Sequence, residues 1–254
     1  MHALVDTHCH LDVPEFDGDR AVVVQRARDA GVTRQIVPAI EASTWPGLRD
    51  ACARHEGLFP AYGLHPLLIA QHRDEHLREL RDWIERERPV AIGECGLDYW
   101  VEDLDREVQA HFFDAQLQLA REFDLPVIVH ARRAVDAVIA SIKRVGTLRG
   151  VIHSYAGSEE QARQLADLGF LIGIGGPVTY ERANRVRRVA ASVPIETLLL
   201  ETDAPDQPDC AHRGERNEPA RMVRVLETIA ALRGVGADVV AAATTANAER
   251  LFAI

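Results

Sequence analysis

Long hydrophobic runs and closely paired cysteines are both missing from the sequence. None of its 254 residues belongs to an apolar stretch of about 18 residues, the length that crosses a bilayer, and no charged and then apolar leader of a secretory signal peptide is present. The cysteines, Cys9, Cys52, Cys95 and Cys210, show no Cys-x-x-Cys spacing, which favours reduced thiols over a disulfide framework. We therefore expect a cytoplasmic protein outside the membrane.

Positive charge is also scarce. The 29 lysines and arginines are outnumbered by 39 aspartates and glutamates, and the formal net charge is −10. A general nucleic-acid-binding protein carries a cationic face, which this composition argues against. The composition still leaves room for a nucleic-acid substrate, if bound metals and a few local arginines neutralise its phosphates.

Size and pattern together indicate the fold. The chain has the length of two small domains or of one α/β barrel of about 250 residues. Continuous apolar runs predict strands over residues 3–5, 35–37, 59–64, 89–93, 125–129, 150–152, 170–174 and 197–200. Apolar spacings of three and four predict helices near 21–30, 45–55, 77–84, 108–119, 135–142, 162–168, 182–190, 219–232 and 238–252.

The strands read as continuously apolar, which is typical of a parallel sheet buried on both faces. Repeated β-then-α units without a linker predict a single (β/α)8 TIM barrel, one domain over residues 1–254, with its active site at the C-terminal mouth of the strands. A doubly wound open sheet is the alternative. That fold would have a glycine-rich fingerprint after its first strand, where His8-Cys9-His10 stands instead.

Metal-type side chains follow the predicted strands. His8 and His10 are two residues apart, so on a strand both imidazoles point the same way. Further polar residues stand at or just past other strand ends, and the ends of barrel strands share one mouth. The predicted metal ligands are His8, His10, Glu94, His130, His153 and Asp203. The histidines outside the predicted site are expected to be mostly solvated: His2, His55, His72, His76, His111 and His212.

Six ligands exceed the three that a single catalytic zinc takes from the protein. Glu94 has two oxygens with which to bridge a pair of ions, so we predict a binuclear site. Two such ions can hold a hydroxide between them and clamp the attacking and leaving oxygens of a displacement at phosphorus. The mixture of imidazole and carboxylate suits Zn²⁺ or Mn²⁺, and Mg²⁺ less obviously.

Short motifs along nearly the whole chain match one family. They are DTHCH at 6–10, GLHP at 63–66, GECGLDY at 93–99, LPVIVH at 125–130, HSYAGS at 153–158, ETDAP at 201–205 and RNEP at 216–219. In this combination the chain resembles the TatD-type metal-dependent hydrolases, a branch of the amidohydrolase-like barrels. The resemblance implies phosphodiester hydrolysis, typically by a DNase that works inward from a 3′ end of DNA.

The resemblance also implies how the ligands are shared. One ion would be held by His8, His10, Glu94 and Asp203. The other would be held by Glu94, His130 and His153. Asp203 would in addition act as general base for the attacking water.

The resemblance gives roles to residues beside the ions as well. His65 would contact the substrate phosphate or donate a proton to the leaving oxygen, or else be a structural histidine at a strand end. Asp98 and Glu201 would orient ligands or pair with arginines. Arg132 would contact phosphate or form a structural ion pair.

Two further patterns are discounted. The glycines of residues 173–176 favour close packing and a turn over a phosphate site, and the basic segment 182–188 is interpreted as a solvated helix face. One position departs from the family: Glu215 stands where many relatives carry lysine, and a carboxylate there would repel a phosphate backbone.

Two alternatives remain beside the DNase. The first is a hydrolase of a small amide, lactone or phosphoester. Many barrels of the wider group bridge their metals with a lysine near the position of Glu94, and Lys143 is the only barrel-region lysine here, within a helix. The second is a non-catalytic metal-binding module, which the complete ligand set disfavours. No obligate protein partner is evident, and a monomer is plausible.

Overall fold

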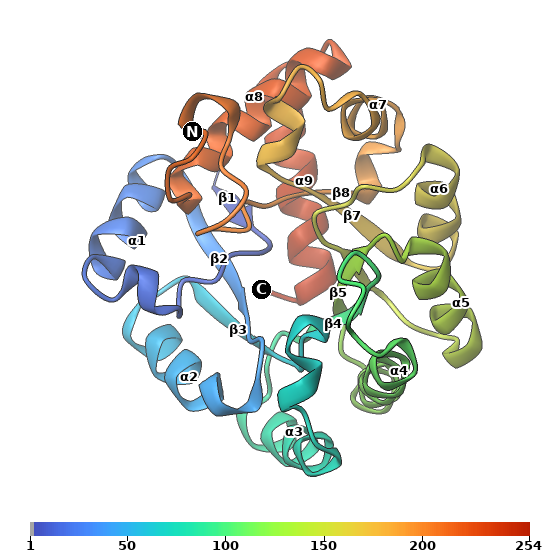
Figure 1. Cartoon of the computed structure of the whole chain (residues 1–254). Coiled ribbons are helices and arrows are strands. Elements are labelled where there is room, and N and C mark those ends of the chain that lie inside the picture. The colour runs from blue at the N-terminus through green and yellow to red at the C-terminus, as the bar shows by residue number, and fades with distance from the viewer. Residues whose placement is uncertain (1–2) are drawn as a thin grey trace.

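The computed structural model describes residues 3–254, so His2 lies outside the described residues. Eight parallel strands form a ring in which each strand pairs with the next along the chain (Figure 1). They are β1 (Leu4–Asp6), β2 (Val32–Pro38), β3 (Leu58–Tyr62), β4 (Ala91–Asp98), β5 (Val127–Arg132), β6 (Gly150–Ile152), β7 (Phe170–Ile174) and β8 (Leu198–Leu200). The predicted (β/α)8 barrel is confirmed.

The first and last strands are joined by hydrogen bonds at and just past their C-terminal ends. The amide of Thr7 donates to the carbonyl of Leu200 at 3.0 Å, and the amide of Asp203 donates to the carbonyl of His8 at 2.8 Å. These bonds place the segment after β8 beside the segment after β1, and so bring Asp203 next to the two N-terminal histidines.

Eight helices surround the ring (Figure 1). They are α1 (Arg20–Asp29), α2 (Trp45–Arg54), α3 (Asp74–Glu87), α4 (Arg106–Phe123), α5 (Val135–Val145), α6 (Glu159–Asp167), α7 (Asn184–Ser192) and α8 (Met222–Arg233). Helix α6 begins three residues earlier than expected, because Ser158 and Gln161 form a capping box that satisfies two free amides of its first turn. Helix α7 begins at Asn184 rather than Arg182, and residues 219–221 form a 3-10 turn before α8.

The last helix, α9 (Ala237–Phe252), closes the bottom of the barrel. Its Ala248, Leu251 and Phe252 are buried in one cluster with residues from inside the ring. The strand residues of this cluster include Val5, Ile36, Ile128, Val151 and Leu199. Because Val5, Ile128 and Leu199 precede His8, His130 and Asp203 along the chain, α9 covers the end opposite to the histidines.

Strands β4 and β5 continue past the positions where the sequence predicts their ends. Glu94 is the fourth of eight residues in β4, and His130 is the fourth of six in β5. Both were expected at strand ends, but both lie inside their strands. The pairing of β4 with β5 changes register between Ile92 and Cys95, an irregularity that re-aims side chains. Gly96 is required there, because a Cβ would lie 2.0 Å from the carbonyl oxygen of His130.

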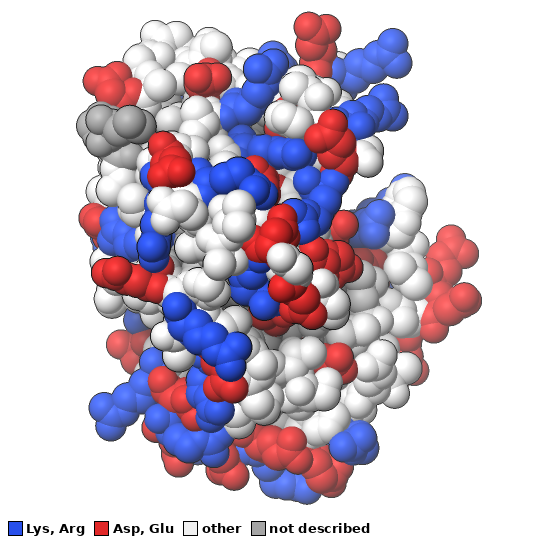
Figure 2. All heavy atoms as spheres, turned by 90° about the vertical axis from the view of Figure 1, so that its left-hand side faces the viewer, with Lys and Arg blue, Asp and Glu red and all other residues white. Residues whose placement is uncertain are grey.

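The surface agrees with the composition. Acidic and basic side chains are interspersed on the side of the molecule shown in Figure 2. Within residues 3–254, no helix combines the length and the apolar character that crossing a membrane requires. All four cysteines are free thiols, of which Cys210 alone is exposed.

Candidate metal centre

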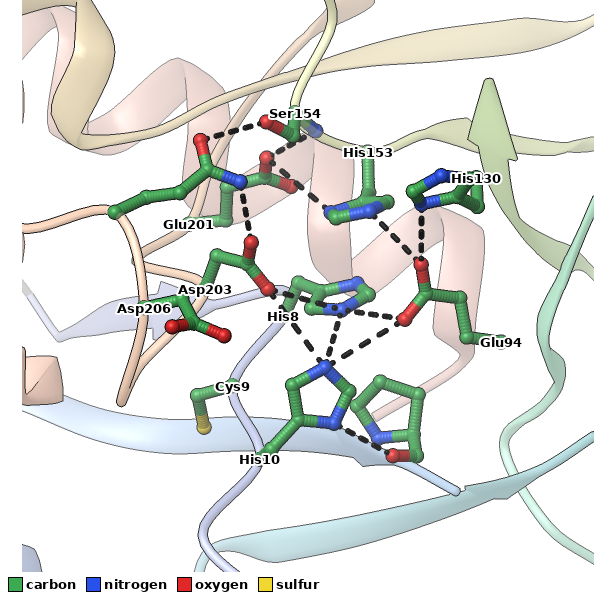
Figure 3. Close-up of polar contacts among 12 residues, drawn as sticks. His8, Cys9, His10, Glu94, His130, His153, Ser154, Glu201, Asp203 and Asp206 are labelled. Carbon is green, nitrogen blue, oxygen red and sulfur yellow. Dashed lines mark hydrogen bonds and ion pairs between the residues drawn. The ribbon is translucent and has the colours of Figure 1, made fainter. Parts of the chain in front are cut away.

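The six predicted metal ligands meet at the mouth of the barrel, although they come from five parts of the chain (Figure 3). His8 and His10 follow β1, Glu94 lies in β4, and His130 lies in β5. His153 directly follows β6, and Asp203 follows β8. In Figure 3 the imidazoles of His8 and His10 lie between the carboxylates of Glu94 and Asp203.

The carboxylate of Glu94 stands at the centre of this group. Its Oε2 lies 3.2 Å from Nε2 of His8 and 3.5 Å from Nε2 of His10. Its Oε1 lies 2.9 Å from Nε2 of His153 and 3.2 Å from Nδ1 of His130. The two oxygens therefore face two different pairs of imidazoles, which is the arrangement that a carboxylate shared between two ions requires.

Asp203 lies near His8 and His10 and so belongs to their side of the site. Its Oδ1 lies 3.5 Å from Nε2 of His8 and 3.7 Å from Nε2 of His10. Its Oδ2 accepts a hydrogen bond from the amide of Gln207, and the other end of that amide accepts from the hydroxyl of Ser154 at 2.8 Å. Gln207 thus orients the carboxylate so that Oδ1 faces the two histidines.

The partners of the imidazoles decide which nitrogen carries a lone pair toward the site. His10 Nδ1 lies 3.1 Å from the carbonyl of Pro38, which can only accept, so Nδ1 carries the proton and Nε2 is left free. His130 Nε2 lies 2.8 Å from Oδ2 of Asp98, which leaves Nδ1 free in the same way. Lone pairs of nitrogen and carboxylate oxygens converging on one space fit divalent cations such as Zn²⁺ or Mn²⁺.

His65 is arranged differently. Its Nδ1 accepts a hydrogen bond from the amide of Leu67 at 3.1 Å, so in the neutral ring the proton is on Nε2. That N–H points at Oε1 of Glu94 at 3.1 Å. Burial lowers the pKa of His65, which favours the neutral ring. His65 is therefore a hydrogen-bond donor at the site, whereas a metal ligand at this position would need a lone pair on Nε2.

Burial and neighbouring charges shift the pKa values of three predicted ligands. Burial acts to raise the pKa of Glu94, but the imidazoles of His153, His65 and His8 outweigh it and hold the pKa well below its usual range. Burial acts to lower the pKa of His153, but the Glu94 carboxylate raises it to about 10. Burial raises the pKa of Asp203, which makes this carboxylate a better proton acceptor.

Asp98 and Glu201 lie behind the ligands, and of the two Asp98 alone is within hydrogen-bond distance of a predicted ligand. Asp98 contacts His130, and Glu201 is fully buried with Oε1 3.9 Å from Nδ1 of His153. Gly173 makes room for this carboxylate, because a Cβ there would lie 2.2 Å from Oε2 of Glu201. This contact agrees with the interpretation that the glycines of residues 173–176 serve close packing.

Sequence reasoning missed the role of Asp6. This carboxylate is fully buried and accepts hydrogen bonds from the amides of His8 and Thr202, at 3.2 and 3.0 Å, and from the Thr202 hydroxyl at 2.6 Å. Asp6 thereby ties the end of β1 to the end of β8 and fixes the two segments that carry His8 and Asp203. The available signal was its place in the DTHCH motif, at the end of an apolar run.

The centre opens into a cleft of about 1270 Å³, lined by His65, Glu94 and Arg132 among others. Arg132 is exposed, and within residues 3–254 its guanidinium has no carboxylate within 4.0 Å. The structural ion pair that was one interpretation of Arg132 therefore finds no support, since Asp98 contacts His130 instead. Within the described chain, Glu215 is not among the residues that line the cleft, and it contacts Arg221 at 3.1 Å.

The histidines outside the site are solvated to different degrees. His111 is exposed, and His55, His76 and His212 are half-buried. The expectation that His72 is solvated is wrong: it is buried, and its Nε2 lies 2.9 Å from the carbonyl oxygen of His65. His72 therefore fixes the backbone that carries His65.

Comparisons with known proteins agree on one family. The family model described as "TatD related DNase" matches residues 5–253. The "Uncharacterized metal-dependent hydrolase YjjV" of Escherichia coli K12 is 43% identical over 252 residues, 98% of this chain and 97% of that protein. Its crystal structure, described as a TatD homologue, gives a TM-score of 0.96 at 41% identity and covers 99% of this chain and 98% of that one. The "3'-5' ssDNA/RNA exonuclease TatD" of a Pantoea species is 36% identical over 260 residues, 98% of this chain and 99% of that protein.

Proposed function

Because the chain belongs to the TatD-related DNase family of metal-dependent hydrolases, we propose that the protein hydrolyses phosphodiester bonds at the 3′ ends of single-stranded nucleic acid. Two divalent ions would bind at the mouth of its barrel. The observation that carries the proposal is the sharing of the Glu94 carboxylate between His8 and His10 on one oxygen and His130 and His153 on the other.

The residues divide between two ion sites. His8, His10 and Asp203 would join Oε2 of Glu94 around the first ion. His130 and His153 would join Oε1 around the second. Ions bound there would lower the pKa of a water and neutralise negative charge at phosphorus.

Three side chains of the protein would transfer protons or contact the substrate. Asp203, oriented by Gln207, would accept a proton from the attacking water, a role suited to a carboxylate whose pKa is raised by burial. His65, whose Nε2 carries the proton, would donate a hydrogen bond to a phosphate oxygen or to the leaving oxygen. Arg132 lines the same cleft, has no carboxylate within 4.0 Å among residues 3–254, and would contact the phosphate.

The preference for a nucleic-acid 3′ end is supported by the relative from Pantoea, whose name states that activity. The cleft of about 1270 Å³ is larger than the roughly 300–1,000 Å³ of typical small-molecule pockets. The net charge of −10 favours local recognition of a strand end over general binding to a duplex.

The proposal is tested with metal-free protein, titrated with Mg²⁺, Mn²⁺ or Zn²⁺ and given single-stranded DNA labelled at either end. We expect metal-dependent cleavage that releases a 3′ label at once as a mononucleotide and shortens 5′-labelled strands stepwise. Early release of the 5′ label would show that degradation starts at the 5′ end instead. Cleavage of a small phosphoester or amide, with DNA left intact under every metal, would replace the DNase with the small-substrate hydrolase.

A further inference from the structure

An exposed tryptophan stands beside the metal centre. Trp100 follows the end of β4 and is 47% exposed, an unusual position for so large an apolar side chain. It lines the same cleft as Glu94 and His130. Trp45 is buried and Trp83 partly buried, so Trp100 is the most exposed of the three tryptophans.

Two arginines from the end of β5 lie against this ring. The guanidinium carbon of Arg133 is 3.8 Å from the ring centroid, and that of Arg132 is 4.8 Å away. Both arginines are exposed, and within residues 3–254 neither has a carboxylate within 4.0 Å. Both guanidinium groups thus lie over the ring, and their N–H groups can contact an anion.

The position of the ring is fixed relative to the metal centre by one carboxylate. Oδ1 of Asp98 accepts hydrogen bonds from the amides of Trp100 and Val101 at 2.9 and 3.2 Å. Oδ2 of the same side chain lies 2.8 Å from Nε2 of His130. The register of the sheet pairs Asp98 with Arg132, so the ring and the arginine come from neighbouring strands.

We propose that Trp100, Arg132 and Arg133 form a stacking platform that binds an unpaired nucleobase of the substrate next to the scissile phosphate. A half-exposed aromatic ring with guanidinium groups over it offers planar surfaces on which any base can stack, which suits single strands without sequence preference. The arginine edges would hold the adjoining phosphates. In an acidic protein this gives local affinity for a single-stranded end, because the bases of an intact duplex are already stacked on one another.

The inference rests on the proposed function for its substrate class, but its test needs no turnover. Metal-loaded protein is titrated with a short single-stranded DNA whose phosphorothioate linkages resist hydrolysis, and with the same strand lacking its two 3′-terminal bases. Binding is followed by fluorescence anisotropy, and tryptophan quenching reports contact with the ring. We expect wild-type protein to bind the base-containing strand roughly 5- to 150-fold more tightly than the abasic one.

Trp100→Ala should bind both strands equally and lose the quenching, whereas Trp100→Phe should keep most of the preference. Trp83→Phe is the matched control for tryptophan fluorescence, and bound metal per chain checks that each variant is folded. Arg133→Ala should weaken binding of both strands, whereas Arg78→Ala, on the exposed side of α3, should not.

Equal binding of the two strands by wild-type protein would overturn the platform, as would a preference that persists in Trp100→Ala. Failure of the proposed function is a separate result, namely the absence of metal-dependent DNA cleavage by wild-type protein. The two failures are therefore distinguishable.

Discussion

A Glu94→Gln variant is expected to lose metal-dependent hydrolysis and to retain at most one ion per chain. The amide keeps the size of the side chain but offers one acceptor oxygen, whereas the carboxylate faces imidazoles with both of its oxygens. Its NH₂ group would point at imidazole lone pairs on one side of the site. The loss of activity should exceed the roughly 10- to 100-fold that removal of a partner outside the ligand set costs.

The measurement is bound metal by elemental analysis beside the rate of DNA hydrolysis. Glu15→Gln makes the same chemical change on an exposed carboxylate that lines the same cleft, and it should keep both metal and activity. Full activity in Glu94→Gln, or the same loss in Glu15→Gln, would contradict the role of Glu94 as the shared ligand.

An Asp203→Asn variant is expected to turn over about 10²- to 10⁴-fold more slowly, the range that a general acid or base contributes. Asparagine tolerates the left-handed backbone at this position, where φ is +57°. The fold should therefore survive, and only the negative charge and the proton-accepting oxygen are lost. The ion held by His130 and His153 should stay bound, because Asp203 faces His8 and His10.

Asp206→Asn is the control for this second variant. Asp206 is an exposed carboxylate three residues further along, lines the same cleft, and should tolerate the change. Metal analysis separates the possible outcomes. Loss of both ions from Asp203→Asn would show that the ligands are divided differently between the ions. Unchanged turnover would show that Asp203 has no catalytic role.

The barrel and the meeting of its polar residues could be predicted from the sequence because both follow from local pattern. Apolar runs and helical spacings gave the repeated β-then-α units, and parallel strands in a ring must end at one mouth. His8 and His10 were expected to converge through the alternation of a strand; they lie past the end of β1 at Asp6, and both still face Oε2 of Glu94. Chain-distant residues such as Glu94 and Asp203 were therefore placed together without any knowledge of contacts.

Other features depend on contacts that no local pattern encodes. The extension of β4 to Asp98 rests on a change of register against β5 and on the close approach of Gly96 to the His130 carbonyl. His72 is buried because its ring meets the His65 carbonyl across a turn. The sequence predicts the helix at 238–252, but nothing in its local pattern places α9 across the bottom of the ring.

The interpretation of Arg132 shows the same limit. From the sequence, an ion pair with a carboxylate such as Asp98 and a phosphate contact were equally open. The register pairs Asp98 with Arg132, but the Asp98 side chain contacts His130, and Arg132 lies beside Trp100. This choice of side-chain partners is a contact that no local pattern encodes.

The most direct test of the binuclear account is the rate of 3′-label release from single-stranded DNA as Mn²⁺ is added stepwise to metal-free protein. If Glu94 is shared by two ions that act together, the first equivalent should give little activity, and the rate should curve upward and level off at two equivalents per chain. A rate that rises in proportion to metal and levels off at one equivalent would contradict the two-ion centre.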